Sequence, residues 1–81
     1  MATRGVKIQY DSLSDVLYVH FVPPYAEQWI DNLDDETTAR MNPITKAVEG
    51  LEVWHYMARI EAGEDVTVPV EAGQVRVLAA A

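Results

Sequence analysis

Hydrophobic and polar residues alternate along the first part of the chain. The stretch "VKIQY" at 6–10 places its apolar residues on one face and its polar residues on the other, which is the period of a half-buried strand. The stretch "VLYVHFV" at 16–22 carries β-branched and aromatic residues on both faces, which is typical of a central strand. The two prolines at 23–24 then end the strand, because proline has no N–H to donate to a neighbour.

Shorter apolar runs continue this pattern, and they predict three more strands, at 26–30, 37–41 and 47–54. The acidic stretch "DNLDDE" at 31–36 and "NPITK" at 42–46 are predicted to be turns, since Asn, Asp and Pro favour them. Gly50 lies inside the last of these strands, where glycine indicates a bulge or a close approach to the backbone.

The segment at 55–62 permits two interpretations. Its alternation would extend the preceding strand, but it is rich in good helix formers and is followed by Gly63, a possible C-cap, so we favour a short helix. Beyond it, "VTVPV" and "VRVL" flank "EAG" as the strands of a hairpin would, and Pro69 suggests an edge strand or arm. The predicted fold class is α+β, mostly β: an antiparallel meander with one short helix packed on one face.

The chain is short and strongly acidic. Its 81 residues suit a single domain, 1–81, and the absence of cysteine excludes disulfides and thiolate metal sites. A net charge of −7 with scattered basic residues opposes direct nucleic-acid binding and favours a cationic protein partner. The alternative is that the charge serves only to keep the protein soluble. The N-terminus lacks a secretory pattern and the longest uncharged stretch has far fewer than the ~20 residues that span a bilayer. We therefore expect a cytoplasmic protein with no membrane association.

Asp11 and Asp15 lie between the first two predicted strands and raise the question of whether they do chemistry. Aspartate side chains accept bonds from backbone N–H groups two residues on, so both suit a connection that must turn. Two carboxylates in one solvated loop lack the opposed environments that separate an acid from a base. We favour the turn interpretation, and on it Asp15→Asn is expected to cost less than about 1 kcal/mol of stability.

No other motif predicts a catalytic residue, a metal ligand or a cofactor. His20 and His55 are far apart in sequence and belong to no metal-binding pattern, and the acidic loop lacks calcium-loop spacing. The serines have no nucleophile-elbow context, and the glycines form no phosphate-binding loop. The alternative to a non-enzymatic protein is a small metal-dependent or acid–base hydrolase that uses Asp15 and His20.

Two short motifs resemble a known family. "YDSLSDVLYVHF" at 10–21 and "GLEV" at 50–53 resemble the small bacterial family catalogued as domain of unknown function 2283. The matching residues are Tyr10, Asp11, Asp15, Leu17, Tyr18, Phe21, Gly50, Leu51, Glu52 and Val53. The resemblance implies a compact β-rich core at 6–62 with an antitoxin-like or other partner-binding role and no catalytic residues. The strand before the turn at 42–46 lacks the family's aspartates, and the arm at 63–81 extends past the family's usual end.

The large aromatic residues bear on self-association. Trp29, Trp54 and Tyr56 suit an interface, or alternatively fill a small core. A single helix covers one face of so small a sheet, which leaves apolar side chains of 16–22 open on the other. The sequence therefore predicts a non-enzymatic interaction module that assembles with itself, most simply as a two-fold dimer, or with a basic protein partner.

Overall fold

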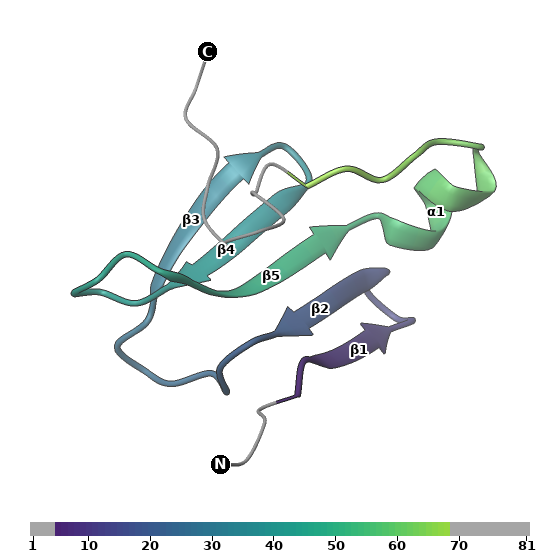
Figure 1. Ribbon diagram of the computed structural model, residues 1–81. Coiled ribbons are helices and arrows are strands. Elements are labelled where there is room, and N and C mark those ends of the chain that lie inside the picture. Colours follow the sequence, from purple (N-terminus) through teal and green to yellow (C-terminus); the bar gives the residue numbers. More distant parts are fainter. Residues whose placement is uncertain (1–4, 69–81) are drawn as a thin grey trace.

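The computed structural model describes residues 5–68, which form one antiparallel sheet followed by a short helix (Figure 1). The strands are β1 (Lys7–Asp11), β2 (Val16–His20), β3 (Trp29–Asp34), β4 (Thr37–Met41) and β5 (Val48–Trp54), and the helix is α1 (Tyr56–Glu61). The predicted fold class, α+β and mostly β, is confirmed.

The order of the strands in the sheet is β1-β2-β5-β4-β3, and every neighbouring pair is antiparallel. This order departs from a simple meander at one connection, because β2 pairs with β5 and the chain then crosses to the opposite edge to form β3. Pro23 and Pro24 stand in that connection, where they prevent β2 from continuing as a strand.

The third strand begins and ends later than predicted. The sequence predicts a strand at 26–30 and a turn at 31–36, but the strand is Trp29–Asp34 and the turn that follows it is short. The Asp34 carboxylate accepts the Glu36 N–H at 2.9 Å and stabilises this turn. The strand tolerates its acidic residues because it is an edge strand whose charged side chains remain in water.

The other predicted elements lie within two residues of their predicted ends. The strand predicted at 37–41 is found at those residues, and the predicted helix at 55–62 is found as α1. Residues 66–68 of the predicted terminal hairpin have no regular structure, and the rest of that hairpin lies outside the described residues.

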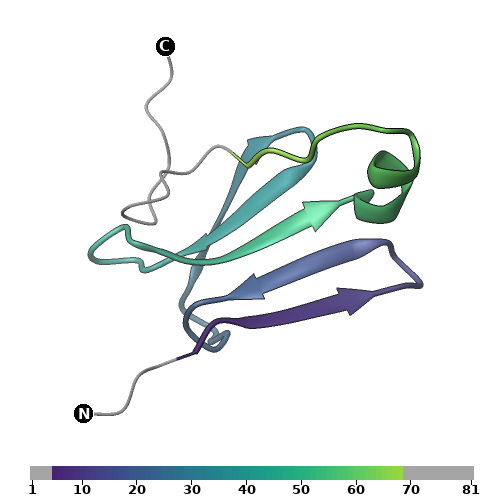
Figure 2. The same cartoon turned by 45° about the vertical axis from the view of Figure 1, so that its right-hand side comes forward.

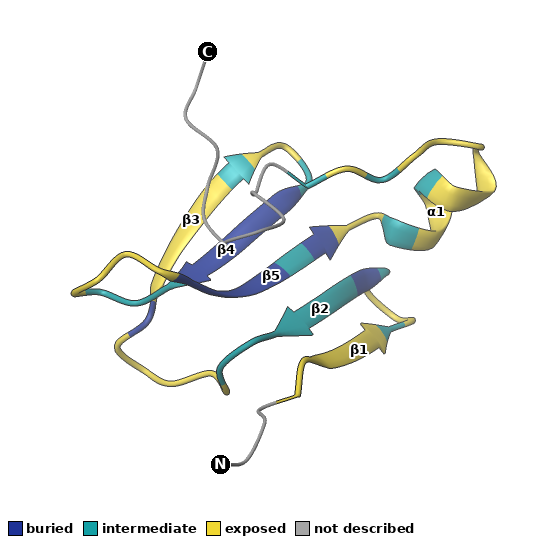
Figure 3. Cartoon of the chain, in the orientation of Figure 1, coloured by how far each residue is buried: buried dark blue, intermediate teal, exposed yellow. Residues whose placement is uncertain are grey.

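The two faces of the sheet differ in character. One face, the apolar face, carries the core of Ala39, Val48 and Leu51, against which Val19, Phe21, Leu33, Met41 and Val68 pack. The other face, the polar face, carries most of the polar residues at the alternate positions of the same strands: Lys7, Gln9, Tyr18, His20, Thr38, Arg40, Asn32 and Glu52. The apolar residues Val16, Ile30 and Trp54 also lie on this face. Burial is concentrated in β4 and β5, whereas β1 and β3 are largely exposed (Figure 3).

The helix lies beyond the end of the sheet, beside the β1–β2 turn, rather than over the middle of a face (Figure 2). None of its residues is buried, because six residues make less than two turns and expose most of their surface. The apolar face is instead covered in part by the segment after the helix, since Val68 packs against the core.

Candidate functional site

The polar face of the sheet is organised around Arg40 of β4, whose side chain is almost fully buried. Its guanidinium lies over Gly50 of β5, and a Cβ at Gly50 would stand 1.9 Å from Nη2 and 2.3 Å from Cζ. Arg40 Nη1 donates to Gln28 Oε1 at 2.9 Å, and Nη2 donates to Nδ1 of His20. Glycine at position 50 therefore leaves room for the guanidinium in its buried, hydrogen-bonded position. The predicted bulge is also present, one residue earlier, where β5 shifts register against β4.

Glu49 stands at the other end of this network. Its carboxylate accepts hydrogen bonds from the Tyr25 hydroxyl at 2.5 Å, from Gln28 Nε2 at 3.0 Å and from Asn42 Nδ2 at 3.2 Å. The hydrogen bond from Tyr25 is the main reason that the pKa of Glu49 lies below its usual value, and the charge of Arg40 adds to the effect. Gln28 thus bridges a buried guanidinium and a buried carboxylate, so both charges are held by hydrogen bonds.

His20 continues the network toward β1. Because Nδ1 accepts from Arg40, we assign the ring proton to Nε2, which donates to Gln9 Oε1 at 2.9 Å. Burial lowers the pKa of His20, and the positive charges of Arg40 and Lys7 lower it further. The ring is therefore neutral near pH 7, and both of its nitrogens are occupied.

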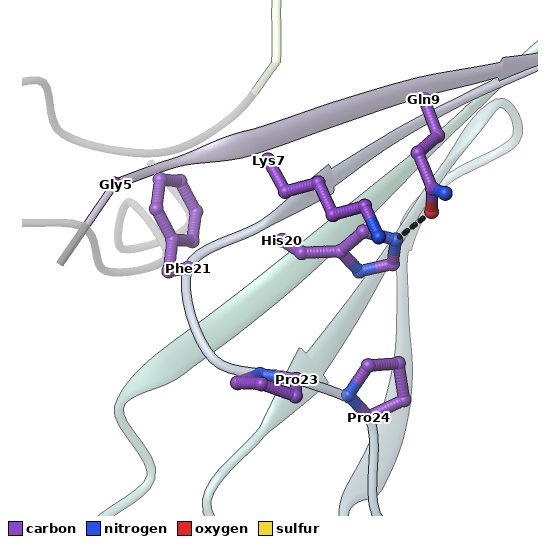
Figure 4. Close-up of a pocket in the computed structure, with 7 residues that line it drawn as sticks. All are labelled: Gly5, Lys7, Gln9, His20, Phe21, Pro23 and Pro24. Atoms are coloured by element: carbon purple, nitrogen blue, oxygen red, sulfur yellow. Dashed lines mark hydrogen bonds between the residues drawn. The ribbon is translucent and has the colours of Figure 1, made fainter.

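A groove of about 520 Å³ lies beside this histidine. Lys7, Gln9 and His20 line it from the sheet, and Pro23 and Pro24 line it from the connection after β2 (Figure 4). Since both nitrogens of His20 already have partners, the ammonium of Lys7 is the charged group that the groove presents.

The His20 network makes stability depend on pH. The unfolded chain takes up a proton on His20 near pH 6.5, whereas in the folded chain burial and the charges of Arg40 and Lys7 lower the pKa, and protonation would also remove the acceptor for Arg40. The stability that the neutral His20 ring contributes should therefore be fully present above about pH 7. The free energy of unfolding should fall as the pH is lowered from 7 to 5. Urea unfolding measured across this range tests the prediction. His20→Asn should flatten the dependence and His55→Gln should leave it in place; an unchanged slope in His20→Asn would contradict it.

Asp15 stabilises the contact between the β1–β2 turn and α1. Its Oδ1 accepts the Tyr10 hydroxyl at 2.5 Å and the Met57 N–H at 2.8 Å, and its Oδ2 accepts the Ala58 N–H at 3.1 Å. The hydrogen bond from Tyr10 is the main cause that lowers the pKa of Asp15, and the same bond raises the pKa of Tyr10 to about 12. Asp15 therefore caps the helix from a distant part of the chain, as an N-cap side chain does locally.

Asp11 shapes the turn itself. Its Oδ1 accepts the Leu13 N–H at 3.0 Å, and a hydrogen bond from Ser14 is the main cause that lowers its pKa. Both aspartates thus have structural partners. Asp11 shapes the turn, as predicted, whereas the Asp15 carboxylate binds α1 and Tyr10 instead.

The residues of the alternative hydrolase are not brought together. Asp15 precedes β2 and His20 ends it, so about five residues of extended chain, roughly 16 Å, separate them. Each already has partners for its polar side-chain atoms. Within residues 5–68, no three histidine, aspartate or glutamate side chains gather as a metal site would require.

The two family-like motifs become neighbours in the sheet. β2 pairs with β5, which sets Tyr18 opposite Glu52 on the polar face and Leu17 opposite Val53 on the apolar face. The Tyr18 ring also stacks on His20, with the ring centroids 6.0 Å apart. Leu51 lies in the core. Most of the motif residues therefore lie in the neighbouring inner strands β2 and β5, and the others lie in or beside the β1–β2 turn that contacts α1.

The two edges of the sheet, β1 and β3, have only one strand neighbour each within the described chain. Directly after β2, the Phe21 N–H donates to the Glu49 carbonyl, which continues the register of β2 with β5. The backbone N–H and C=O groups of the odd-numbered residues of β2 therefore point toward β5, and those of the even-numbered residues point toward β1. The β1 residues opposite those even positions are Lys7, Gln9 and Asp11. The backbone N–H and C=O groups of Ile8 and Tyr10 therefore point outward.

The edges differ in how well they are protected. β3 contains Asp31 and Asp34, is followed by Asp35 and Glu36, and has a register irregularity, all features that discourage pairing with another strand. β1 has a charged residue at each end, Lys7 and Asp11, but it has no proline and no bulge, and its middle carries Ile8, which is 62% exposed. Val6 and Tyr10 are also exposed on the same face. Within residues 5–68, β1 is the edge that is open to another strand.

The three aromatic residues predicted as an interface do not form one patch. Trp29 begins β3 and is exposed, with the Lys46 ammonium 3.0 Å from the centre of its ring. Trp54 ends β5 at the opposite end of the sheet. Tyr56 begins α1 and packs against Tyr10, with the ring centroids 6.1 Å apart. Tyr56 thus contacts a residue of β1.

Sequence reasoning missed two features of the site. Arg40 is the only charged residue of "TTARM", and its position opposite Gly50 depends on strand pairing that the sequence does not display. Ile8 was expected to face a core, but β1 extends past the covered part of the apolar face.

Comparison with known proteins identifies no matching family, no similar curated protein and no similar solved structure. The resemblance to domain of unknown function 2283 therefore stays a prediction from the quoted motifs. None of the helices in the described part of the chain is long and apolar enough to cross a membrane.

Proposed function

We propose that this protein is a non-enzymatic interaction module that binds another polypeptide by adding a strand to the β1 edge. The observation that carries the proposal is the outward-facing backbone of Ile8 and Tyr10 on an unprotected edge strand. Strand addition supplies main-chain hydrogen bonds for affinity, and exposed side chains on alternate positions supply specificity.

Two further observations support this function over catalysis. The polar side chains that resemble catalytic groups are engaged in structural hydrogen bonds, as shown for Asp15 and His20. Apolar side chains are exposed along the same edge, and burying each one would contribute about 1.5–3 kcal/mol. If the partner is not a second copy of this chain, the net charge of −7 favours a basic protein. A basic partner fits an antitoxin-like role.

The test compares two equally exposed isoleucines on the two edges, Ile8 on β1 and Ile30 on β3, each 62% exposed. A lysine in place of either isoleucine adds a charge without an opposite-charge partner to that edge, which discourages strand addition. Native mass spectrometry of the full chain, purified at low ionic strength from its own host, should show a stoichiometric polypeptide partner, either a second copy or another protein. Ile8→Lys should remove this partner and Ile30→Lys should retain it, while both variants melt within a few degrees of the wild type. A complex that survives Ile8→Lys would contradict the proposed function.

A further inference from the structure

We infer that the strand added to the β1 edge is β1 of a second copy of this chain, paired antiparallel about a two-fold axis at Gln9. The inference rests on the proposed function and specifies its partner. It joins two five-stranded sheets into one ten-stranded sheet, with the polar faces on the same side.

The backbone permits this register. In an antiparallel pair, residues that exchange both hydrogen bonds alternate with residues that exchange none. Because the backbone N–H and C=O groups of Ile8 and Tyr10 point outward, these two residues must occupy the positions that exchange hydrogen bonds. A two-fold axis at Gln9 sets Ile8 opposite Tyr10 of the second copy and Tyr10 opposite Ile8, so four backbone hydrogen bonds form between them.

The side chains are complementary in the same register. Lys7 faces Asp11 of the second copy, and Asp11 faces its Lys7, so two opposite-charge pairs form on one face. On the other face Ile8 packs against Tyr10 twice, which pairs an aliphatic with an aromatic side chain. β1 is therefore self-complementary in both charge and shape.

Neighbouring registers and the other edge lack this complementarity. Moving the axis to Ile8 or to Tyr10 keeps the backbone bonds but separates Lys7 from Asp11. Pairing β3 with itself about Asp31 would set two aspartates face to face, and like charges directly opposite each other are destabilising. The β1 pair at Gln9 is the register that the charges favour.

Single cysteines in β1 test the register, because the chain contains no cysteine of its own. At the two-fold axis the two Gln9 Cα atoms should be about 4.5 Å apart, within the range of a disulfide. The two Ile8 Cα atoms should be about 8 Å apart, which is too far. Under mild oxidation Gln9→Cys should therefore form a covalent dimer much faster than Ile8→Cys, Tyr10→Cys and the β3 control Ile30→Cys.

Sedimentation equilibrium gives a second measurement that does not depend on oxidation. The wild-type chain of 9.1 kDa should reach twice that mass as concentration rises, and Lys7→Asp should raise the dissociation constant by about tenfold or more, because it sets like charges opposite each other at two places. Gln9→Ser, which removes the same hydrogen bond to His20 as the cysteine variant, should still dimerise and serves as the folding control.

Three outcomes would overturn the inference. Fastest coupling at Ile8→Cys or Tyr10→Cys would mean a different register. Coupling in β1 no faster than at Ile30→Cys, or a wild-type chain that stays monomeric, would mean that a second copy is not the partner. In that case, if Ile8→Lys removes a different polypeptide from the native complex, the proposed function stands. If it removes none, both the proposed function and this inference are wrong.

Discussion

Gly50→Ala should lower the free energy of unfolding by about 2–3 kcal/mol. The new Cβ would occupy the space of the Arg40 guanidinium, at 1.9 Å from Nη2, so the guanidinium must leave its place. Its hydrogen bonds to Gln28 and His20 would then be lost. For a chain of this size that loss is a large fraction of the total stability. Urea unfolding at a fixed protein concentration measures the change.

A double-mutant cycle with Arg40→Ala shows whether the guanidinium is the cause. In the Arg40→Ala background the space over Gly50 is empty, so Gly50→Ala should be neutral or should stabilise by about 0.5–1 kcal/mol, as alanine does relative to glycine within a strand. An equal cost of Gly50→Ala in both backgrounds would mean that something other than Arg40 requires glycine here.

Asp15→Asn should lower the free energy of unfolding, and by more than Asp11→Asn does. An amide group has one acceptor oxygen, whereas the Asp15 carboxylate accepts three hydrogen bonds through two oxygens. The amide nitrogen would face a donor, and the bonds that remain would lose their charge assistance. The helix should also fray, because Met57 and Ala58 N–H groups lie in its first turn. Urea unfolding and helix content by circular dichroism measure both effects.

Asp11→Asn is the matched control for this prediction. The Asp11 carboxylate accepts the Leu13 N–H through one oxygen and also accepts a hydrogen bond from Ser14, both within the exposed turn, and an asparagine oxygen can keep the bond to Leu13. The cost of Asp11→Asn should therefore be smaller than that of Asp15→Asn. Equal costs for the two variants would contradict the helix-capping role of Asp15.

Local patterns predicted most of the elements. The alternation at 6–10 and the residues 37–41 correspond closely to β1 and β4, because side-chain period and strand propensity are local properties. β3 was displaced because its aspartates resemble a turn, although in an edge strand they remain hydrated. The meander predicted from the sequence does not include the pairing of β2 with β5, because that pairing joins residues thirty or more positions apart.

The site was harder to predict for the same reason. The turn role of Asp11 depends on a residue two positions away, and the sequence indicated it. The partners of Asp15 in α1 lie 42 and 43 residues along the chain, so only the fold reveals them. Gly50 was recognised as unusual, but its partner Arg40 became apparent only from the register of β4 and β5.

Hydrogen exchange at the backbone amides of Ile8 and Tyr10 tests strand addition at the β1 edge most directly. Both N–H groups face outward in the single chain, so they should exchange rapidly in dilute solution. We predict that their exchange slows strongly as the concentration of the purified chain rises from micromolar to millimolar, while exchange along the β3 edge does not change. Exchange at Ile8 and Tyr10 that stays rapid at every concentration, and also in the complex purified from the host, would contradict this account.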